Sequence, residues 1–269
     1  MEHQKMGRLR AYARFLAGAF SANLQAVVEY RVSFLVQVFG MVLNNAAFAI
    51  FWGALIARVG AIGGYGFTDV MIIWALTSTS FGIAHVLWGN IRNLGQIILR
   101  GELDVYLLQP KDPFLNVLAS RTIVSAWGDL LYGYLVLAFL PGTGPERLAL
   151  FTLLALAGAV VFASVFSAAE SLTFFLGNAG ALSSAVTEFM VSFSLYPETV
   201  FDPGMRWIFY TILPSGFIAY VPLSVYRSLD WPLVPLLFLV AAAYACGSYA
   251  LFRAGLRRYE SGNQMGTRV

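Results

Sequence analysis

Hydrophobic windows of about twenty residues recur along the whole chain, and short polar or glycine- and proline-rich segments separate them. Each window is long enough to cross a hydrocarbon core of roughly 30 Å as an α-helix. We therefore expect residues 1–269 to form one all-α polytopic membrane domain with six transmembrane helices. The expected spans are residues 33–57, 68–88, 114–140, 148–169, 181–200 and 231–252.

Residues 1–31, which precede the first span, are too polar and basic for a cleaved signal sequence. Apolar side chains such as Phe15 and Phe20 recur at helical spacing, while Arg8 and Arg10 fall on the other side. This pattern predicts an interfacial helix that lies on the cytoplasmic leaflet of the membrane.

The longest charged interruption is residues 89–113, between the second and third spans. Its apolar residues Ile91, Leu94, Ile97 and Ile98 recur at helical spacing, which predicts an amphipathic helix. One interpretation is a solvated helix whose charges keep it out of the membrane. The other is a docking element, in which the apolar stripe sits in a partner's groove and the charged residues fix its register.

Prolines and glycines break the hydrophobic pattern between the fifth and sixth spans. Pro197 and Pro203 end the fifth span, and Pro214 and Pro222 interrupt the apolar segment that follows. Short helices that re-enter the membrane from outside, within residues 201–230, fit these positions better than a complete crossing.

The distribution of positive charge supports this topology. Lysine and arginine gather in the segments expected on the cytoplasmic side, and both termini are expected there. If residues 206–226 crossed the membrane completely, the arginine-rich tail would lie outside. The segments expected outside contain only Arg58, Arg147, Arg206 and Arg227.

Composition agrees with a membrane protein: 59% of the residues are hydrophobic, 12% are charged, and the mean hydropathy is +0.71. The net charge of +3 is explained by cations at span ends, so we expect no nucleic-acid partner. The single cysteine, Cys246, excludes an intrachain disulfide and a thiolate metal cluster. We expect no metal site, no cofactor and no catalytic residues, since no nucleophile and base pair is evident.

Two acids fall near the middle of predicted spans, where ionisable groups are costly and usually face protein or water. Asp129 and Glu188 either line a translocation path or satisfy a local helix contact. The aromatic residues Phe189, Phe193 and Tyr196 are further candidates for that path, although lipid-facing or core positions are commoner for such residues. These five residues are the candidate translocation residues.

Other residues at membrane depth have simpler expected roles. Arg121 and Glu170 fall near span ends, where long side chains reach the interface. A stripe of small residues on the fourth span predicts close packing of helices. This stripe consists of Ala155, Ala159, Ala163 and Ser167.

Several short phrases occur along the chain in a characteristic order and spacing: Glu29-Tyr30-Arg31, Arg100-Gly101-Glu102-Leu103-Asp104, Leu107-Leu108-Gln109-Pro110, Tyr196-Pro197, Ile212-Leu213-Pro214, Ala219-Tyr220-Val221-Pro222 and Gly255-Leu256-Arg257-Arg258-Tyr259. In this order they resemble the permease subunits of bacterial type-2 ATP-binding-cassette exporters that are encoded in pairs beside an ATPase. The resemblance covers nearly the whole chain.

The resemblance implies a bacterial inner or plasma membrane protein that forms a transport path with a second permease, either a paralogue or an identical copy. It implies two copies of an ATPase subunit and an amphipathic cargo such as a drug, lipid or glycolipid. It also makes residues 89–113 a cytoplasmic coupling helix. The ATPase-coupling candidates there are Ile97, Arg100, Gly101, Glu102, Leu103 and Asp104.

The chain has no glycine-rich phosphate loop with a lysine, so ATP hydrolysis is expected on a separate subunit. The alternative function is an ATP-independent secondary transporter or channel, in which Asp129 and Glu188 couple transport to an ion. That function calls for internal symmetry, and the two halves of the chain show no convincing repeat.

Overall fold

A computed structural model describes residues 2–260, and every regular element in this range is a helix. The all-α prediction is thereby confirmed for this part of the chain. The longer helices are α1 (Glu2–Glu29), α2 (Arg31–Val59), α3 (Phe67–Trp88), α7 (Ala126–Phe139), α8 (Pro145–Ser171), α10 (Gly180–Leu195) and α12 (Val234–Leu256). The shorter ones are η1 (Gly89–Asn93), α4 (Leu94–Leu99), α5 (Leu103–Leu107), α6 (Pro113–Ala119), α9 (Thr173–Leu176), η2 (Glu198–Val200), η3 (Pro203–Tyr210), η4 (Ser215–Phe217), α11 (Tyr220–Ser228) and η5 (Trp231–Leu233).

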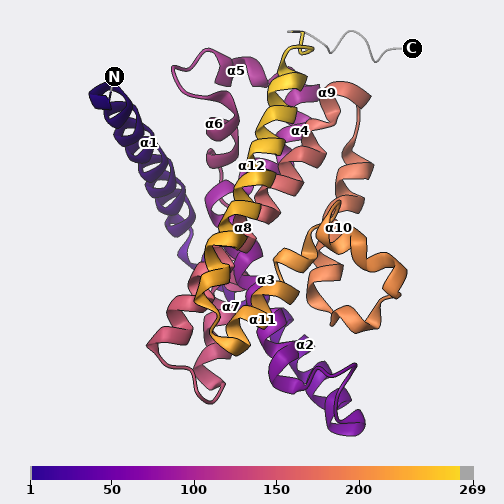
Figure 1. The fold of residues 1–269 in the computed structure, drawn as a ribbon. Coiled ribbons are helices and arrows are strands. Elements are labelled where there is room, and N and C mark those ends of the chain that lie inside the picture. Colours follow the sequence, from indigo (N-terminus) through magenta and orange to yellow (C-terminus); the bar gives the residue numbers. More distant parts are fainter. Residues whose placement is uncertain (1, 261–269) are drawn as a thin grey trace.

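The centre of the bundle is α3, which packs against α7 and α8 along its length and also contacts α2, α10 and α11 (Figure 1). Every residue from Val70 to Ser80 is buried. Hydroxyl groups in this stretch bond to different neighbours: Thr77 Oγ1 donates to the Ser194 carbonyl of α10 at 2.7 Å, and Ser78 Oγ donates to the Asp129 carbonyl of α7 at 2.8 Å. A helix without a polar face suits this enclosed position.

The predicted small-residue stripe on α8 lies in the packed interior. Ala155, Ala159 and Ser167 are fully buried, and the Oγ atoms of Ser167 and Ser248 of α12 lie 2.7 Å apart. Small side chains let helices approach closely, so this packing prediction is confirmed.

The predicted third span, residues 114–140, is two helices rather than one. Residues 120–125 separate α6 from α7 because their polar groups bond outside a helix. The Ser120 hydroxyl accepts from Asn90 Nδ2 at 2.7 Å, and the Ile123 amide donates to the His85 carbonyl at 3.1 Å. Such competing bonds end a helix that hydrophobicity alone would continue.

Among residues 2–260, four helical segments are long and apolar enough to cross a membrane, judged by length and composition: Arg31–Val59, Phe67–Leu99, Pro145–Leu176 and Trp231–Leu256. The apolar helices α7 and α10 are shorter, at 14 and 16 residues. The residues of α10 therefore extend roughly 24 Å, less than a hydrocarbon core of about 30 Å. The pair formed by η3 and residues 215–228 passes the same test only together and bends by 70°, which suits a broken span or a re-entrant loop. The six-span topology stays a prediction.

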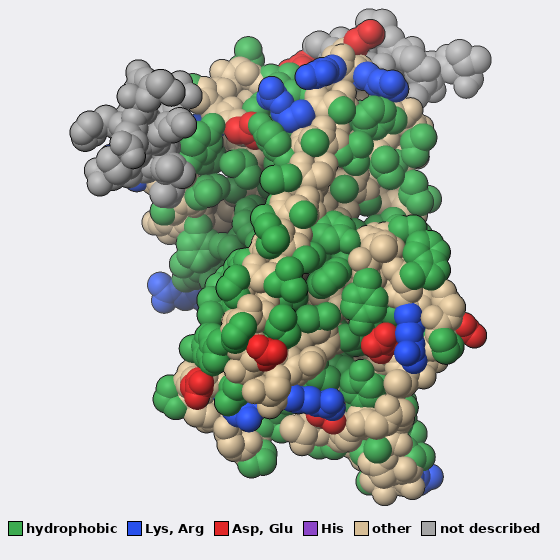
Figure 2. Space-filling view, in the orientation of Figure 1, with side chains coloured by type: hydrophobic (Ala, Val, Ile, Leu, Met, Phe, Trp, Pro, Cys, Tyr) green, Lys and Arg blue, Asp and Glu red, His purple; other side chains and the backbone are tan. Residues whose placement is uncertain are grey.

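The start of α1, the end of α12, α5 and α9 all lie at the upper end of Figure 1, whereas α11 and the end of α2 lie in its lower part. On the face shown in Figure 2, most charged side chains lie near the top or in the lower third, and a broad hydrophobic area separates them. The start of α1 and the end of α12 thus lie on the same side of the bundle.

Helix α1 runs obliquely beside the bundle until the chain turns at Tyr30 into α2 (Figure 1). Asn23 Nδ2 donates to the Ala119 carbonyl at 2.9 Å, and Lys111 lies over the ring of Phe15 at 5.4 Å. The side chains of Arg8 and Arg10 lie outside the described part of the chain, and the interfacial position of α1 stays a prediction.

Candidate functional site

One face of α10 is left uncovered by the rest of the described chain. Its other face packs on α3 and α8 and buries Ser183, Met190 and Ser194. The uncovered face carries the exposed Glu188 and the half-exposed Phe189. The structure therefore places these two candidate translocation residues on one surface, whereas the partly exposed Tyr196 packs its ring against that of Trp52 of α2, with the centroids 5.8 Å apart.

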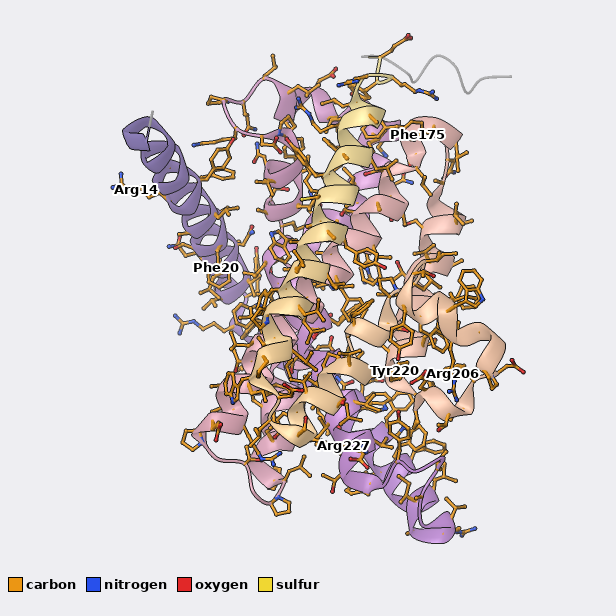
Figure 3. The ribbon with its side chains drawn as sticks, viewed as in Figure 1. Arg14, Phe20, Phe175, Arg206, Tyr220 and Arg227 are labelled. Carbon is orange, nitrogen blue, oxygen red and sulfur yellow. The ribbon has the colours of Figure 1, made fainter. Side chains whose placement is uncertain are left out.

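Phe193 borders that surface, since its ring stacks on that of Phe189 with the centroids 5.8 Å apart, and it also joins the segment that follows α10. Its ring contacts those of Phe201 and Phe209, with centroids 5.2 and 4.9 Å away. The Tyr220 hydroxyl of α11 donates to the Phe193 carbonyl at 2.5 Å and to the Tyr196 carbonyl at 3.2 Å. The segment of residues 197–228, called the hairpin below, is thus packed against the last turn of α10 (Figure 3).

An ion pair connects the hairpin to the first turn of α3. Arg227 Nε donates to Asp69 Oδ1 at 2.6 Å, Arg227 Nη2 pairs with Asp69 Oδ2, and the guanidinium lies over the ring of Tyr65 at 5.5 Å. Burial raises the pKa of Tyr65, and the Glu198 carboxylate acts in the same direction. A planar two-point contact of this kind fixes orientation as well as distance.

Asp129 is separate from the α10 face. It is 4% exposed on α7, and its Oδ1 atom accepts a hydrogen bond from Asn45 Nδ2 of α2 at 2.8 Å. Its Oδ2 atom is buried without a hydrogen-bond partner among the described residues. Of the two interpretations of Asp129, this geometry corresponds to the local helix contact.

The apolar stripe of residues 89–113 packs within this chain. Ile91, Leu94, Ile97 and Ile98 are each at most 5% exposed and belong to the core formed with α8. Through η1 and α4 the segment extends α3, so the stripe does not face a partner.

A sharp turn at Gly101 then changes the direction of the chain. Gly101 has a φ of 72°, and the Glu102 amide donates to the Ile97 carbonyl at 3.0 Å. Leu103 is buried, whereas Val105 is 61% and Leu108 is 88% exposed. The outward hydrophobic surface of this segment is therefore on α5 and the residue that follows it, a feature that helical periodicity did not reveal.

Glu170 connects three helices, a role that the sequence did not suggest. Its Oε2 atom accepts from the Gly95 amide of α4 at 3.0 Å, and its Oε1 atom accepts from the Ser183 hydroxyl of α10 at 2.5 Å. A Cβ atom at Gly95 would overlap Glu170 Oε2 and approach Thr173 Oγ1 to 3.0 Å. A glycine inside a helical segment often marks such close packing, and this was the available signal.

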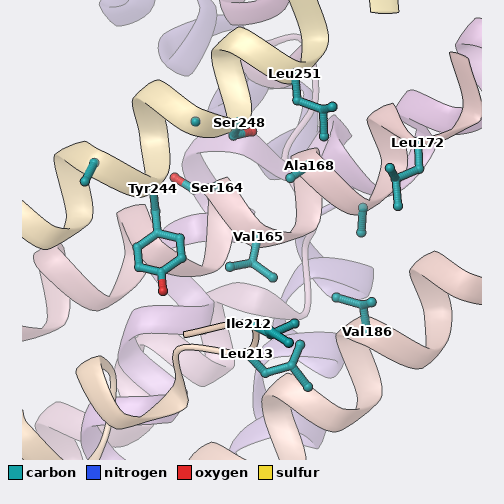
Figure 4. A pocket seen from close by; sticks show the side chains of 13 residues that line it. Ser164, Val165, Ala168, Leu172, Val186, Ile212, Leu213, Tyr244, Ser248 and Leu251 are labelled. Atoms are coloured by element: carbon teal, nitrogen blue, oxygen red, sulfur yellow. The ribbon is translucent and has the colours of Figure 1, made fainter. Parts of the chain in front are cut away.

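A hydrophobic groove of about 460 Å³ lies between α8, α10 and α12 (Figure 4). Its walls include Val165, Ala168 and Val186, and Leu213 of the hairpin covers one end. Tyr244 on α12 donates from its hydroxyl to the Thr211 carbonyl at 2.5 Å, which fastens the hairpin beside the groove. An apolar cavity of this size suits hydrocarbon rather than a charged solute.

No group of three or more His, Cys, Asp or Glu residues that could hold a metal ion occurs within residues 2–260.

A family model described as ABC-2 family transporter protein matches residues 42–263. The match begins within α2 and includes all the coupling and translocation candidates. No curated protein and no solved structure matches the chain.

Proposed function

Because the chain belongs to the ABC-2 family of transporter proteins, we propose that it is the permease subunit of an ATP-driven exporter in a bacterial inner or plasma membrane. In this proposal both termini and residues 89–113 are cytoplasmic, and the hairpin lies on the outer side. A second permease, identical or paralogous, completes the path, and two ATPase subunits bind at the cytoplasmic end.

The observation that carries the proposal is the uncovered face of α10. Glu188 and Phe189 are exposed there, whereas Ser183, Met190 and Ser194 on the other side of α10 are buried against the bundle. A carboxylate exposed to lipid is costly, so the face requires water or a second subunit beside it. A second permease that faces this helix would enclose a path with an acid and aromatic rings in its wall.

Helix α5 supplies the surface on which an ATPase subunit would act. Leu108 and Val105 project outward, and the charged side chains of Arg100, Glu102 and Asp104 are near them in the sequence. Hydrophobic anchors surrounded by charges suit a protein interface. Ile97 and Leu103 are buried, and in this proposal they connect the docking surface to the packed core.

Movement at α5 has a physical route to the translocation face. The buried α4 joins α5 to the core, and Glu170 bonds both to Gly95 of α4 and to Ser183 of α10. A displacement of α4 would therefore act on α10 through two hydrogen bonds to a single carboxylate. This route gives the coupling segment a function beyond solubility.

An amphipathic cargo agrees with both surfaces. The groove between α8, α10 and α12 is lined mainly by hydrocarbon, while the α10 face carries a carboxylate. The alternative, an ion-coupled secondary transporter, has less support because Asp129 is enclosed by Asn45 and does not share the surface of Glu188.

Co-expression of the chain with the ATPase and permease encoded beside it tests the proposal. We expect the proteins to purify together in detergent, and we expect the complex to hydrolyse ATP faster when amphipathic cargo is added. An isolated chain that transports cargo in vesicles without any ATPase would refute it.

A further inference from the structure

Arg121 lies where two surface hollows meet, at the break between α6 and α7. One hollow, of about 510 Å³, is polar and is bordered by η1, α4 and α5, with Gln96 and Tyr106 in its wall. The other, of about 300 Å³, lies at the elbow between α1 and α2 and includes Val27 and Phe34. Arg121 lines both, so one cation faces a polar chamber and a partly apolar one.

The polar chamber is held in shape by its own hydrogen bonds. Asn93 Nδ2 donates to Asn90 Oδ1 at 2.9 Å, Asn90 Nδ2 donates to Ser120 Oγ at 2.7 Å, and the Tyr106 hydroxyl lies 3.3 Å from Ser120 Oγ. These contacts connect η1, the end of α6 and α5. The chamber wall is therefore preorganised by hydrogen bonds between three separate helical segments.

Two side chains in the wall have unused hydrogen-bonding capacity. Among the described residues, neither the Arg121 guanidinium nor the Gln96 amide has a hydrogen-bond or ion-pair partner. Glu102 supplies the one carboxylate in the wall. Its Oε1 atom lies 3.9 Å from Arg100 Nη1, so the positive charge of Arg100 offsets its negative charge. The chamber wall thus contains the Arg121 cation without a counter-ion within the described chain and, elsewhere in the same wall, an amide without a partner.

The elbow between α1 and α2 indicates the depth of these hollows. The chain changes at Tyr30 from the polar α1 to the strongly hydrophobic α2, and Tyr30 itself is 71% exposed. Tyrosine at such a transition is typical of the headgroup level of a membrane. Arg121 therefore lies at the depth of lipid phosphates rather than of hydrocarbon.

We propose that Arg121, with Gln96, binds the phosphate of an anionic lipid headgroup, whose glycerol and first acyl carbons lie in the elbow hollow against Val27 and Phe34. Arginine suits phosphate because its planar donors match two oxygens at once. The polar chamber takes the rest of the headgroup. The site is distinct from the α10 face, and the proposal does not rest on ATP-driven export.

The test uses the purified full-length permease, without an ATPase, in neutral detergent micelles. The unfolding midpoint is measured while dioleoylphosphatidylglycerol or dioleoylphosphatidylcholine is titrated, since a ligand of the folded state raises it. We expect preferential stabilisation by phosphatidylglycerol and about tenfold weaker apparent affinity in Arg121→Gln, the usual effect of losing a charge-assisted hydrogen bond.

Arg92→Gln is the matched control, because Arg92 is exposed in η1 and lines neither hollow. This variant should keep the affinity of the wild type. If Arg121→Gln fails to fold, Arg121→Lys and Gln96→Ala replace it. We expect Arg121→Lys to have an apparent affinity for phosphatidylglycerol between those of the wild type and Arg121→Gln, and we expect Gln96→Ala to lower that affinity a few-fold.

Equal stabilisation by both lipids, or equal losses in the variants of Arg121 and Arg92, would overturn the site. In a last titration, inorganic phosphate replaces the lipid. If it stabilises the protein as well as phosphatidylglycerol does at the same concentration, the lipid assignment is overturned in favour of a free phosphate. Because no transport is measured, failure of this proposal is distinguishable from failure of the exporter proposal.

Discussion

Asn45 of α2 and Asp129 of α7 form a buried hydrogen bond, with 2.8 Å between Nδ2 and Oδ1. Most of α2 is exposed, and its buried residues are Asn45, Trp52 and Ile56. This hydrogen bond thus fixes the position of α2 against α7, whereas hydrophobic contacts alone would allow α2 to shift along its neighbour. It also explains an acid at membrane depth without a role in ion coupling.

We expect Asn45→Ala to lower the free energy of unfolding by about 1–3 kcal/mol, because it leaves a buried carboxylate oxygen unpaired. Thermal unfolding of the detergent-purified protein measures the change. The control is Asn44→Ala, since Asn44 is exposed and, within residues 2–260, the one hydrogen bond of its amide is a weak one to Met41 Sδ at 3.9 Å. Equal midpoints for the two variants would contradict this assignment.

Gly95→Ala should uncouple ATP hydrolysis from transport in the assembled complex. The new methyl group would overlap the Glu170 carboxylate and displace it from Ser183, so α4 and α10 would lose their common contact. We expect cargo-stimulated hydrolysis to fall severalfold while the complex still assembles. Both quantities are measured on the purified complex.

Gly40→Ala serves as the control for Gly95→Ala, because a Cβ atom at Gly40 meets nothing within 4 Å. Alanine there should be neutral or stabilise α2 by up to about 1 kcal/mol. Normal stimulation in Gly95→Ala would show that Glu170 has only a packing role.

Leu108→Ser should weaken binding of the ATPase subunit about tenfold, as expected when a hydrophobic anchor is removed from an interface. Pull-down of the ATPase at several concentrations measures the loss. Phe139→Ser is matched in exposure, at 87% against 88%, but lies at the end of α7. Binding that is reduced equally by both substitutions would argue against docking on α5.

Glu188→Gln should change the rate or selectivity of transport and leave the unfolding midpoint within about 0.5 kcal/mol of the wild type, as for other exposed positions. Transport into inverted vesicles and thermal unfolding are the two measurements. Glu29→Gln, on the exposed end of α1, is the control. Unaltered transport of every cargo tested would remove Glu188 from the proposed path.

The sequence by itself determined the membrane class, the helical content and the approximate limits of most hydrophobic helices. These properties depend on runs of consecutive residues, since a helix of about twenty apolar residues is recognisable without knowledge of its neighbours. The stripe on α8 was equally readable, because close packing needs small residues at helical spacing. The local phrases indicated the family that the match over residues 42–263 shows.

Only the tertiary structure decided which neighbour each face meets. Periodicity recognised an amphipathic segment around Ile97, yet it could not tell a partner's groove from the chain's own core, because both bury the same side chains. The break at residues 120–125 and the contacts of Glu170 depend on atoms that are 13 to 75 residues apart in the sequence. Directional hydrogen bonds between such distant groups exist only after the helices have packed, and they placed Asp129 in a helix contact and left Glu188 on an open face.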